Sequence, residues 1–301
     1  MNGISPASAG GARTKAPPVR PEFEIKPSED VTVGEVERPL SAWERVTNIT
    51  AVRRVSILVM LALVWEAYAR WLNSPLMFPT FVDTAVAFWD ALLTGGLLGK
   101  AWNSIEVLLM GYAAGVSLAA VLTTLAVSTR IGNDLLATLT SMFNPLPAIA
   151  LLPLALLWFG LGNPSLIFVL IHAVLWPVSL NTHSGFMAVS DTLRMAGRNY
   201  GLSRIGYVVR ILVPAAFPSI LTGLKIGWAF AWRTLIAAEL VFGVSSGSGG
   251  LGWFIYENKN ELETAYVFAG LGTVIIIGLL VENFVFRIIE ARTVLKWGMQ
   301  R

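Results

Sequence analysis

Long apolar runs with few charges are the feature that most restricts how this chain can fold. A helix needs about 20 apolar residues to cross the hydrocarbon core of a membrane. Five runs of roughly that length are clear, and a sixth contains Pro145, Pro147 and Pro153, which predict a broken or kinked helix. The sequence therefore predicts an all-α integral membrane protein with six transmembrane helices. The expected spans are 55–71, 105–127, 135–159, 164–183, 220–242 and 266–287.

Composition excludes several classes of protein. Only 14% of the residues are charged, against roughly a quarter in an average soluble domain, and the mean hydropathy is +0.65. The chain has no cysteine and two histidines, His172 and His183, so disulfides are excluded and a site built from several histidines is not expected. The net charge of +3 is spread along loops, and we expect no nucleic-acid partner.

The beginning of the chain differs from the rest. Residues 1–45 are rich in Pro, Gly, Ala, Glu and Lys and poor in large apolar groups. Such a segment cannot bury enough surface to offset the entropy lost on ordering. We therefore predict a disordered cytosolic tail over residues 1–45 and a transmembrane domain over residues 46–301, in contact with the lipid bilayer.

A pair of glycines in the second expected span indicates close helix packing. Gly111 and Gly115 form a small-xxx-small pattern, which lets two helix backbones approach each other. The partner helix belongs either to the same bundle or to a second copy of the chain.

Positive charge is distributed unevenly between the loops. The loop between the fifth and sixth spans holds three glutamates and one lysine, whereas the loop between the fourth and fifth spans holds four arginines and one acid. Because basic loops face the cytosol, the sequence predicts that the Arg-rich loop and both termini are cytosolic. The basic residues that decide this are Arg194, Arg198, Arg204, Arg210, Arg287, Arg292, Lys296 and Arg301.

The Arg-rich loop, residues 191–214, has the pattern of a short helix–turn–helix. Asp191 is a good N-cap, and Gly201 can end the first helix in a left-handed conformation. Leu193, Ala196 and Tyr200 share one face of that helix, while two arginines four residues apart lie on another. Two interpretations remain open: a docking element for a cytosolic partner, or a solvated loop whose arginines only set the orientation.

Ionisable residues within the spans are candidates for function. Arg233 places a permanent charge near the middle of the fifth span, where inserting a charge into the membrane costs free energy. Glu239 lies six residues further on and therefore faces another side of the helix. Arg233 either faces a pore and attracts anions, or pairs with Glu282 or with backbone carbonyls. His172 either lines a pore or packs through hydrogen bonds.

Motifs for catalysis are weak. The one Gly-Lys pair, Gly99-Lys100, lacks the surrounding P-loop pattern, so any ATP hydrolysis belongs to another chain. Gly247-Ser248-Gly249 resembles the setting of a nucleophilic serine, but both histidines lie upstream and no third group is evident. We interpret this segment as a turn and the chain as non-catalytic.

Several motifs resemble those of a known family. Met195-Ala196-Gly197, Gly201 and Val213-Pro214 occupy the positions of Glu-Ala-Ala, Gly and Leu-Pro in the EAA loop of binding-protein-dependent permeases. Met195 replaces the acid of that motif, and Gly197 replaces an alanine. The resemblance covers about residues 55–297. Over this range the chain is similar to permeases of taurine, alkanesulfonate and nitrate importers. The other stretches that carry it are 145–153, 157–160, 177–182, 231–232, 238–239, 249–252 and 287–297.

This resemblance implies the permease subunit of a type I ATP-binding-cassette importer, a multi-pass protein of the bacterial inner (plasma) membrane. It implies a second permease subunit, as a homodimer, cytosolic ATPase subunits on the EAA loops and a periplasmic solute-binding protein. This chain would bind no cofactor, since ATP and Mg belong to the ATPase. The expected solute is a small anion of the sulfonate, taurine, nitrate or aromatic carboxylate type.

Two sets of residues follow from this interpretation. Those expected to couple to the ATPase are Leu193, Arg194, Met195, Ala196, Gly197, Arg198, Gly201 and Pro214. Those expected on the substrate pathway are Arg233, Glu239, His172 and Pro147. The competing hypotheses are a stand-alone secondary transporter or channel, for which no inverted repeat is apparent, and a membrane scaffold without transport.

Overall fold

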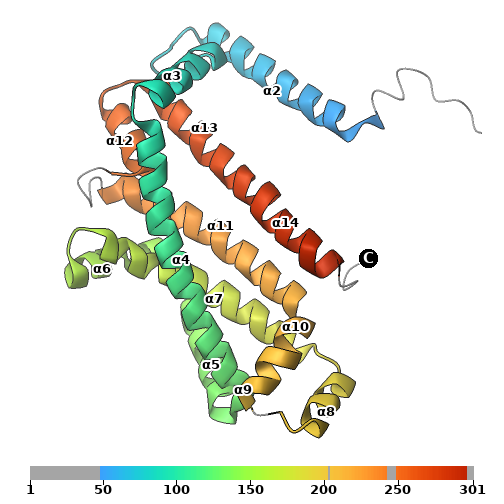
Figure 1. Ribbon diagram of the computed structural model, residues 1–301. Helices are drawn as coiled ribbons and strands as arrows, with labels where there is room; N and C mark the ends of the chain where they lie inside the picture. Colours follow the sequence, from blue (N-terminus) through green and yellow to red (C-terminus); the bar gives the residue numbers. More distant parts are fainter. Residues whose placement is uncertain (1–47, 203, 243–248, 297–301) are drawn as a thin grey trace, which may run out of the picture. The chain divides into compact units, whose positions relative to one another are not determined.

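The chain is helical throughout the part that the structure describes. The computed structural model describes residues 48–202, 204–242 and 249–296, and every regular element there is a helix (Figure 1). The chain divides into two compact units, Met1–Val55 and Ser56–Arg301, and only the end of the first is described. The all-α prediction is confirmed, whereas the predicted tail 1–45 lies outside the described residues.

Four helices are long and apolar enough to cross a membrane: α2 (Thr50–Leu72), α4 (Leu97–Ser128), α7 (Asn163–Met187) and the continuous run Thr264–Leu295. That run comprises α13 (Thr264–Leu280), η3 (Val281–Phe286), α14 (Arg287–Glu290) and η4 (Ala291–Leu295). Two further pairs of helices qualify only when taken together across a sharp bend. The described residues therefore give four spans, or up to six if each bent pair is one span, and six is the number that the sequence predicts.

The first bent pair confirms the predicted break at the prolines. Helix α5 (Arg130–Phe143) meets Ala148–Phe159 at 88°. Pro145 and Pro147 cannot donate backbone hydrogen bonds, so the helix ends before them and restarts as a 3₁₀ turn, η1 (Ala148–Leu151). Pro153 stands in the first turn of α6 (Leu152–Phe159), where a missing N–H is tolerated.

The second bent pair joins the predicted coupling loop to the fifth span. Ile205–Ala215 meets Phe217–Val241 at 80°. Short elements make up the first arm, and the long helix α11 forms the second. The elements of this region are α8 (Asp191–Asn199), α9 (Arg204–Tyr207), η2 (Val208–Leu212), α10 (Val213–Ala215) and α11 (Phe217–Phe242).

Helices α4, α7 and α11 pack together around the main apolar core (Figure 1). A Cβ at Gly111 would lie 2.5 Å from Leu170 Cβ, and one at Gly115 would lie 2.8 Å from Val174 Cβ. These glycines therefore let α4 approach α7 closely, as the small-xxx-small pattern predicts. The partner helix belongs to the same chain.

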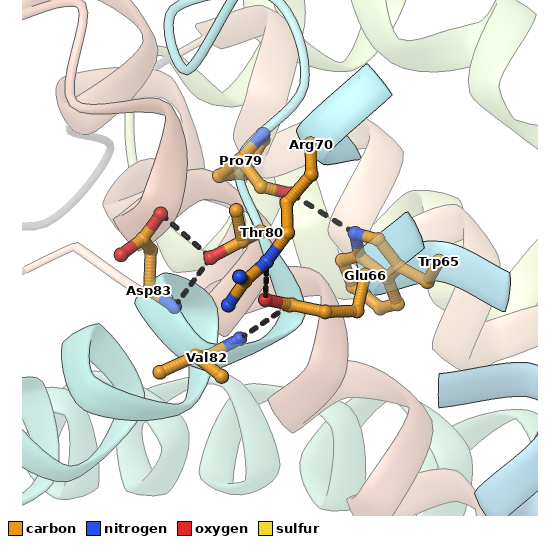
Figure 2. A network of polar contacts seen from close by, with 7 residues as sticks. All are labelled: Trp65, Glu66, Arg70, Pro79, Thr80, Val82 and Asp83. Carbon is orange, nitrogen blue, oxygen red and sulfur yellow. Dashed lines mark hydrogen bonds and ion pairs between the residues drawn. The ribbon is translucent and has the colours of Figure 1, made fainter. Parts of the chain in front are cut away.

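A polar network fixes the connection between α2 and α3 (Phe81–Leu93). Glu66 accepts a hydrogen bond from Arg70 Nε at 2.7 Å and another from the backbone N–H of Val82 at 3.3 Å (Figure 2). Trp65 Nε1 donates to the carbonyl of Pro79 at 3.0 Å. Glu66 of the first span is thus paired with Arg70 of its own helix, and its carboxylate is also hydrogen-bonded to the start of α3.

Candidate functional site

The predicted coupling loop folds as two short helical segments joined by a turn. Helix α8 ends at Asn199, and Gly201 follows with a φ of 64°. A Cβ at Gly201 would meet no atom within 4 Å, so this position requires glycine for its backbone conformation and not for space. Pro214 stands in the first turn of α10, where its missing N–H is tolerated.

Gly197 has a steric role in this loop. A Cβ added there would lie 2.8 Å from the ring of Tyr207 and 3.1 Å from Ile211. Glycine therefore allows α8 to pack directly on the α9–η2 segment, where the family motif has an alanine. Ala196, one residue earlier, is half-buried.

Apolar side chains remain uncovered on the coupling loop. Leu193 and Met195 are 45% and 56% exposed, and Tyr200 is 82% exposed. Ile205 and Val209, on the second segment, are exposed as well. A docking surface would use such apolar side chains, and docking at this loop stays a prediction.

Arg194 binds the end of α7. Its Nη2 donates to the carbonyl of Phe186 at 2.5 Å, and its Nε donates to the carbonyl of Val189 at 3.0 Å. A cation at a helix C-terminus satisfies free carbonyls and interacts favourably with the helix dipole. Arg194 therefore joins α8 to a membrane-spanning helix, a contact that the sequence did not indicate. The side chain of Arg198 lies outside the described part of the chain.

Two of the four predicted pathway residues line one cavity. Pro147 and His172 lie on a cavity of about 240 Å³, which we name the α7–α11 cavity. Trp176 and Pro177 of α7 and Phe230 and Thr234 of α11 are also part of its lining. The bend between α5 and η1, which contains Pro145 and Pro147, provides the remaining wall. Sequence reasoning missed Trp176 and Phe230, because an aromatic residue in a span is more often a packing residue.

His172 belongs to an aromatic cluster at this cavity. Its ring centroid lies 5.9 Å from that of Trp176, which in turn stacks on Phe143 at 5.5 Å and 10°. Neither nitrogen of His172 nor the indole nitrogen of Trp176 has a hydrogen-bond partner among the residues described. His172 is therefore not the hydrogen-bonded packing residue of the alternative interpretation. Its place on the pathway stays a prediction.

Arg233 is exposed on α11 at the same level as Phe230. Its Nε donates to the carbonyl of Ala229 at 3.0 Å, and its guanidinium carbon lies 5.0 Å from the centroid of the Phe230 ring. The backbone contact is one of the alternatives that the sequence left open. The other, an ion pair with Glu282, is not formed in the described part of the chain.

Glu239 faces a different side of α11, as its spacing from Arg233 predicts. It is buried and accepts hydrogen bonds from Ser104 Oγ at 2.9 Å and from the backbone N–H of Gly252 at 2.8 Å. Ser104 Oγ also accepts from the N–H of Leu251 at 2.8 Å. The two side chains therefore cap the N-terminus of α12 (Leu251–Asn260).

The glycines before and within α12 make this cap possible. A Cβ at Gly250 would lie 2.1 Å from Glu239 Oε1, and one at Gly252 would lie 2.5 Å from Glu239 Cβ. These contacts give Glu239 a structural role, and its predicted place on the pathway has no separate support. In the described part of the chain, no group of three or more His, Cys, Asp or Glu is placed to hold a metal ion. Residues 247–248 of the segment that we interpret as a turn lie outside the described residues.

Comparison with known proteins gives a consistent result. Residues 111–294 match the family described as "Binding-protein-dependent transport system inner membrane component". A protein of Methanocaldococcus jannaschii described as an ABC transporter permease is 31% identical over 237 residues, covering 77% of this chain and 87% of that protein.

Two other relatives carry names that include a solute. A protein of Bacillus subtilis described as an aliphatic sulfonates transport permease is 30% identical over 224 residues, covering 74% of this chain and 79% of the relative. The taurine transport system permease protein of Escherichia coli is 34% identical over 150 residues, which cover 50% of this chain and 53% of the relative.

Proposed function

Because this chain belongs to the family of binding-protein-dependent transport system inner membrane components, we propose that it forms the translocation pathway of an importer for a small anionic solute. Members of this family are non-catalytic permease subunits of ABC transporters, embedded in the membrane by several spans. The relatives named for sulfonates and taurine support a solute of the sulfonate type.

The proposed assembly contains other chains. Two copies of this permease form the pathway, and a cytosolic ATPase that binds ATP and Mg docks on each coupling loop. A periplasmic binding protein delivers the solute to the opposite side. Both termini face the cytosol of a bacterial cell with the permease in its inner membrane. The exposed apolar side chains of Leu193 and Met195 support docking at the coupling loop.

The observation that carries the pathway assignment is the exposure of Arg233. A permanent charge at the centre of a span costs about 2.5–3.5 kcal/mol on insertion scales when it faces lipid. Arg233 has no carboxylate partner among the residues described, so its face of α11 is unsuited to lipid. A water-filled pathway between two permease subunits would accommodate that charge and attract an anion.

The contacts of Arg194 suggest how movement reaches this region. If the docked ATPase moves α8, the hydrogen bonds of Arg194 would move the end of α7 with it. Helix α7 contains Pro177, which interrupts its backbone hydrogen bonding and lies at the α7–α11 cavity together with His172. A shift of α8 during the ATPase cycle would therefore alter the cavity next to Arg233.

The test is the substitution Arg233→Gln, which keeps polarity and approximate length but removes the charge. We expect the variant to assemble with its ATPase in normal yield and to transport an anionic sulfonate at least about tenfold more slowly. Complex yield and uptake are measured on the same preparation. Unchanged uptake would exclude the pathway role, and failed assembly would indicate that Arg233 is a structural residue.

A further inference from the structure

Three cavities follow one another along α5 and α7. The α7–α11 cavity shares Asn144 and Pro145 with a second cavity, which has a volume of about 340 Å³. The second cavity shares His183 with a third, of about 460 Å³, which reaches Arg194 of the coupling loop. We name the second and third cavities together the α5–α7 groove. The groove leads from the α7–α11 cavity to the side of the protein that the positive-inside rule predicts to be cytosolic.

The face of α5 that lines the groove is polar. Residues with a spacing of three or four lie on one side of a helix. The lining residues of α5 recur at such intervals and include Asn133, Ala137, Thr140, Ser141 and, just after the helix, Asn144. The opposite side of α5 is apolar and exposed, with Ile131, Leu135 and Met142. Because polar side chains within a span face protein or water and not lipid, we expect the apolar side of α5 to face lipid and the polar side to face water.

The two histidines of the chain lie on the facing helix. His172 and His183 are eleven residues apart in α7, close to three turns, and therefore share one of its sides. His172 lines the α7–α11 cavity, and His183 lines both cavities of the groove. Arg130 and Asp134, which are both exposed, line the end of the groove next to the coupling loop. Polar side chains therefore mark the whole length of the groove.

Several polar atoms along this line lack a partner. Thr140 Oγ1 and His183 Nε2 in the groove are covered and have no hydrogen-bond partner among the described residues. The same is true of Trp176 Nε1 at the α7–α11 cavity. A covered polar group without a partner is unfavourable, so these atoms are available to a polar molecule that enters the groove. The acyl chain of a lipid would leave them without partners.

We propose that the solute leaves the α7–α11 cavity toward the cytosol along the α5–α7 groove and that His183 binds it on this route. His183 lies where the two cavities of the groove meet. A neutral imidazole carries one N–H donor and one acceptor, so it can bind an anion through a hydrogen bond without holding it by charge. Binding of this moderate strength lets a solute enter a site and also leave it. This inference rests on the proposed function and adds the cytosolic half of the pathway to it.

Thiol labelling tests the route, because the chain has no cysteine and each variant therefore carries a single thiol. The variants are Thr140→Cys, in the groove, and Met142→Cys, on the exposed apolar side of the same helix, as the matched control. The reagent is 2-sulfonatoethyl methanethiosulfonate, a small anion that does not cross membranes and reacts with the ionised thiol, which forms in water. In inverted membrane vesicles that contain the permease–ATPase complex, we expect Thr140→Cys to react at least about tenfold faster than Met142→Cys.

Uptake measurements link the groove to transport. The labelled complexes are purified and reconstituted with the binding protein, and ATP-driven uptake of labelled ethanesulfonate is followed. We expect the attached reagent to reduce uptake at least about tenfold in Thr140→Cys, since it fills the groove, and to leave uptake by Met142→Cys unchanged. His183→Leu should reduce uptake about five- to tenfold with normal complex yield, the effect of one hydrogen bond. His183→Gln, which keeps a polar group near the position of Nε2, should retain most of the uptake.

Several outcomes would overturn the inference. These are equal labelling of the two cysteine variants, no labelling of Thr140→Cys, or full uptake after Thr140→Cys has been labelled. Wild-type uptake by both His183 variants would remove His183 from the route, and failed assembly of both would assign it a structural role. In each of these cases, ATP-driven uptake by the wild-type complex leaves the proposed function standing, whereas its absence would contradict the proposed function itself.

Discussion

At the scale of single residues, charge within the spans is handled in three ways. Glu66 is neutralised by Arg70 in the same helix, and Glu239 is buried and surrounded by hydrogen-bond donors. Arg233 is left with a backbone carbonyl and an aromatic ring. A buried charge is tolerated when hydrogen bonds surround it. Arg233 lacks a charged partner, and we therefore explain its position by function.

The cap of α12 gives a prediction at this scale. Gly250→Ala places a Cβ 2.1 Å from Glu239 Oε1 and 2.3 Å from Ser104 Oγ. Because overpacking of this kind typically costs about 1–3 kcal/mol, we expect a clear decrease in the thermal unfolding temperature of the purified permease. The matched control is Gly272→Ala, where a Cβ would meet no atom within 4 Å. Equal unfolding temperatures for the two variants would contradict the proposed cap.

Sequence reasoning succeeds with residues where local periodicity decides the answer. The spacing of Arg233 and Glu239 placed them on different sides of one helix, and the structure has one exposed and the other buried. The partner of Glu239 could not be predicted in this way, since Ser104 lies 135 residues earlier in the chain. The glycines of 249–252 entered the sequence analysis only as part of the family resemblance, and their contacts with Glu239 and Ser104 were not predicted.

At the scale of elements too, features set by the local sequence could be predicted, whereas contacts between separate elements could not. The prolines at 145 and 147 predicted the break between α5 and η1, because their effect on a helix is local. The contact of α8 with α7 was not predicted. It depends on how the chain turns between Met187 and Asp191, and the sequence predicted Arg194 as a residue that couples to the ATPase, not as a contact of α7. The structure instead gives Arg194 two carbonyl partners, Phe186 in α7 and Val189 just after it.

Arg194 gives a prediction about coupling. Arg194→Gln removes hydrogen bonds to the end of α7 and leaves the exposed apolar surface of α8 in place. We therefore expect the ATPase to co-purify normally while uptake per ATP hydrolysed falls several-fold, about the effect of losing hydrogen bonds worth 1–3 kcal/mol. Arg210→Gln, which removes an exposed arginine of the same loop, should change neither quantity. Loss of ATPase binding in Arg194→Gln would show instead that Arg194 contacts the ATPase.

At the scale of the whole molecule, the apolar spans and the bent pairs agree with the architecture expected of the family. The number of crossings and their direction follow from charge and hydropathy. The sequence predicts that six crossings place both termini in the cytosol. A reporter at the C-terminus that fluoresces only in the cytosol should therefore be bright, and one that is active only in the periplasm should be inactive. The reverse pattern would require an odd number of crossings or the opposite insertion.

We propose that this chain forms the pathway of an ATP-driven importer, and solute uptake by proteoliposomes is the test of this proposal. The permease is reconstituted with the ATPase and the binding protein of its host, and accumulation of a labelled sulfonate is followed with and without ATP. We predict accumulation only when ATP, the ATPase and the binding protein are all present. Uptake by the permease alone, in the absence of ATP, would contradict the account and identify a channel or a secondary transporter.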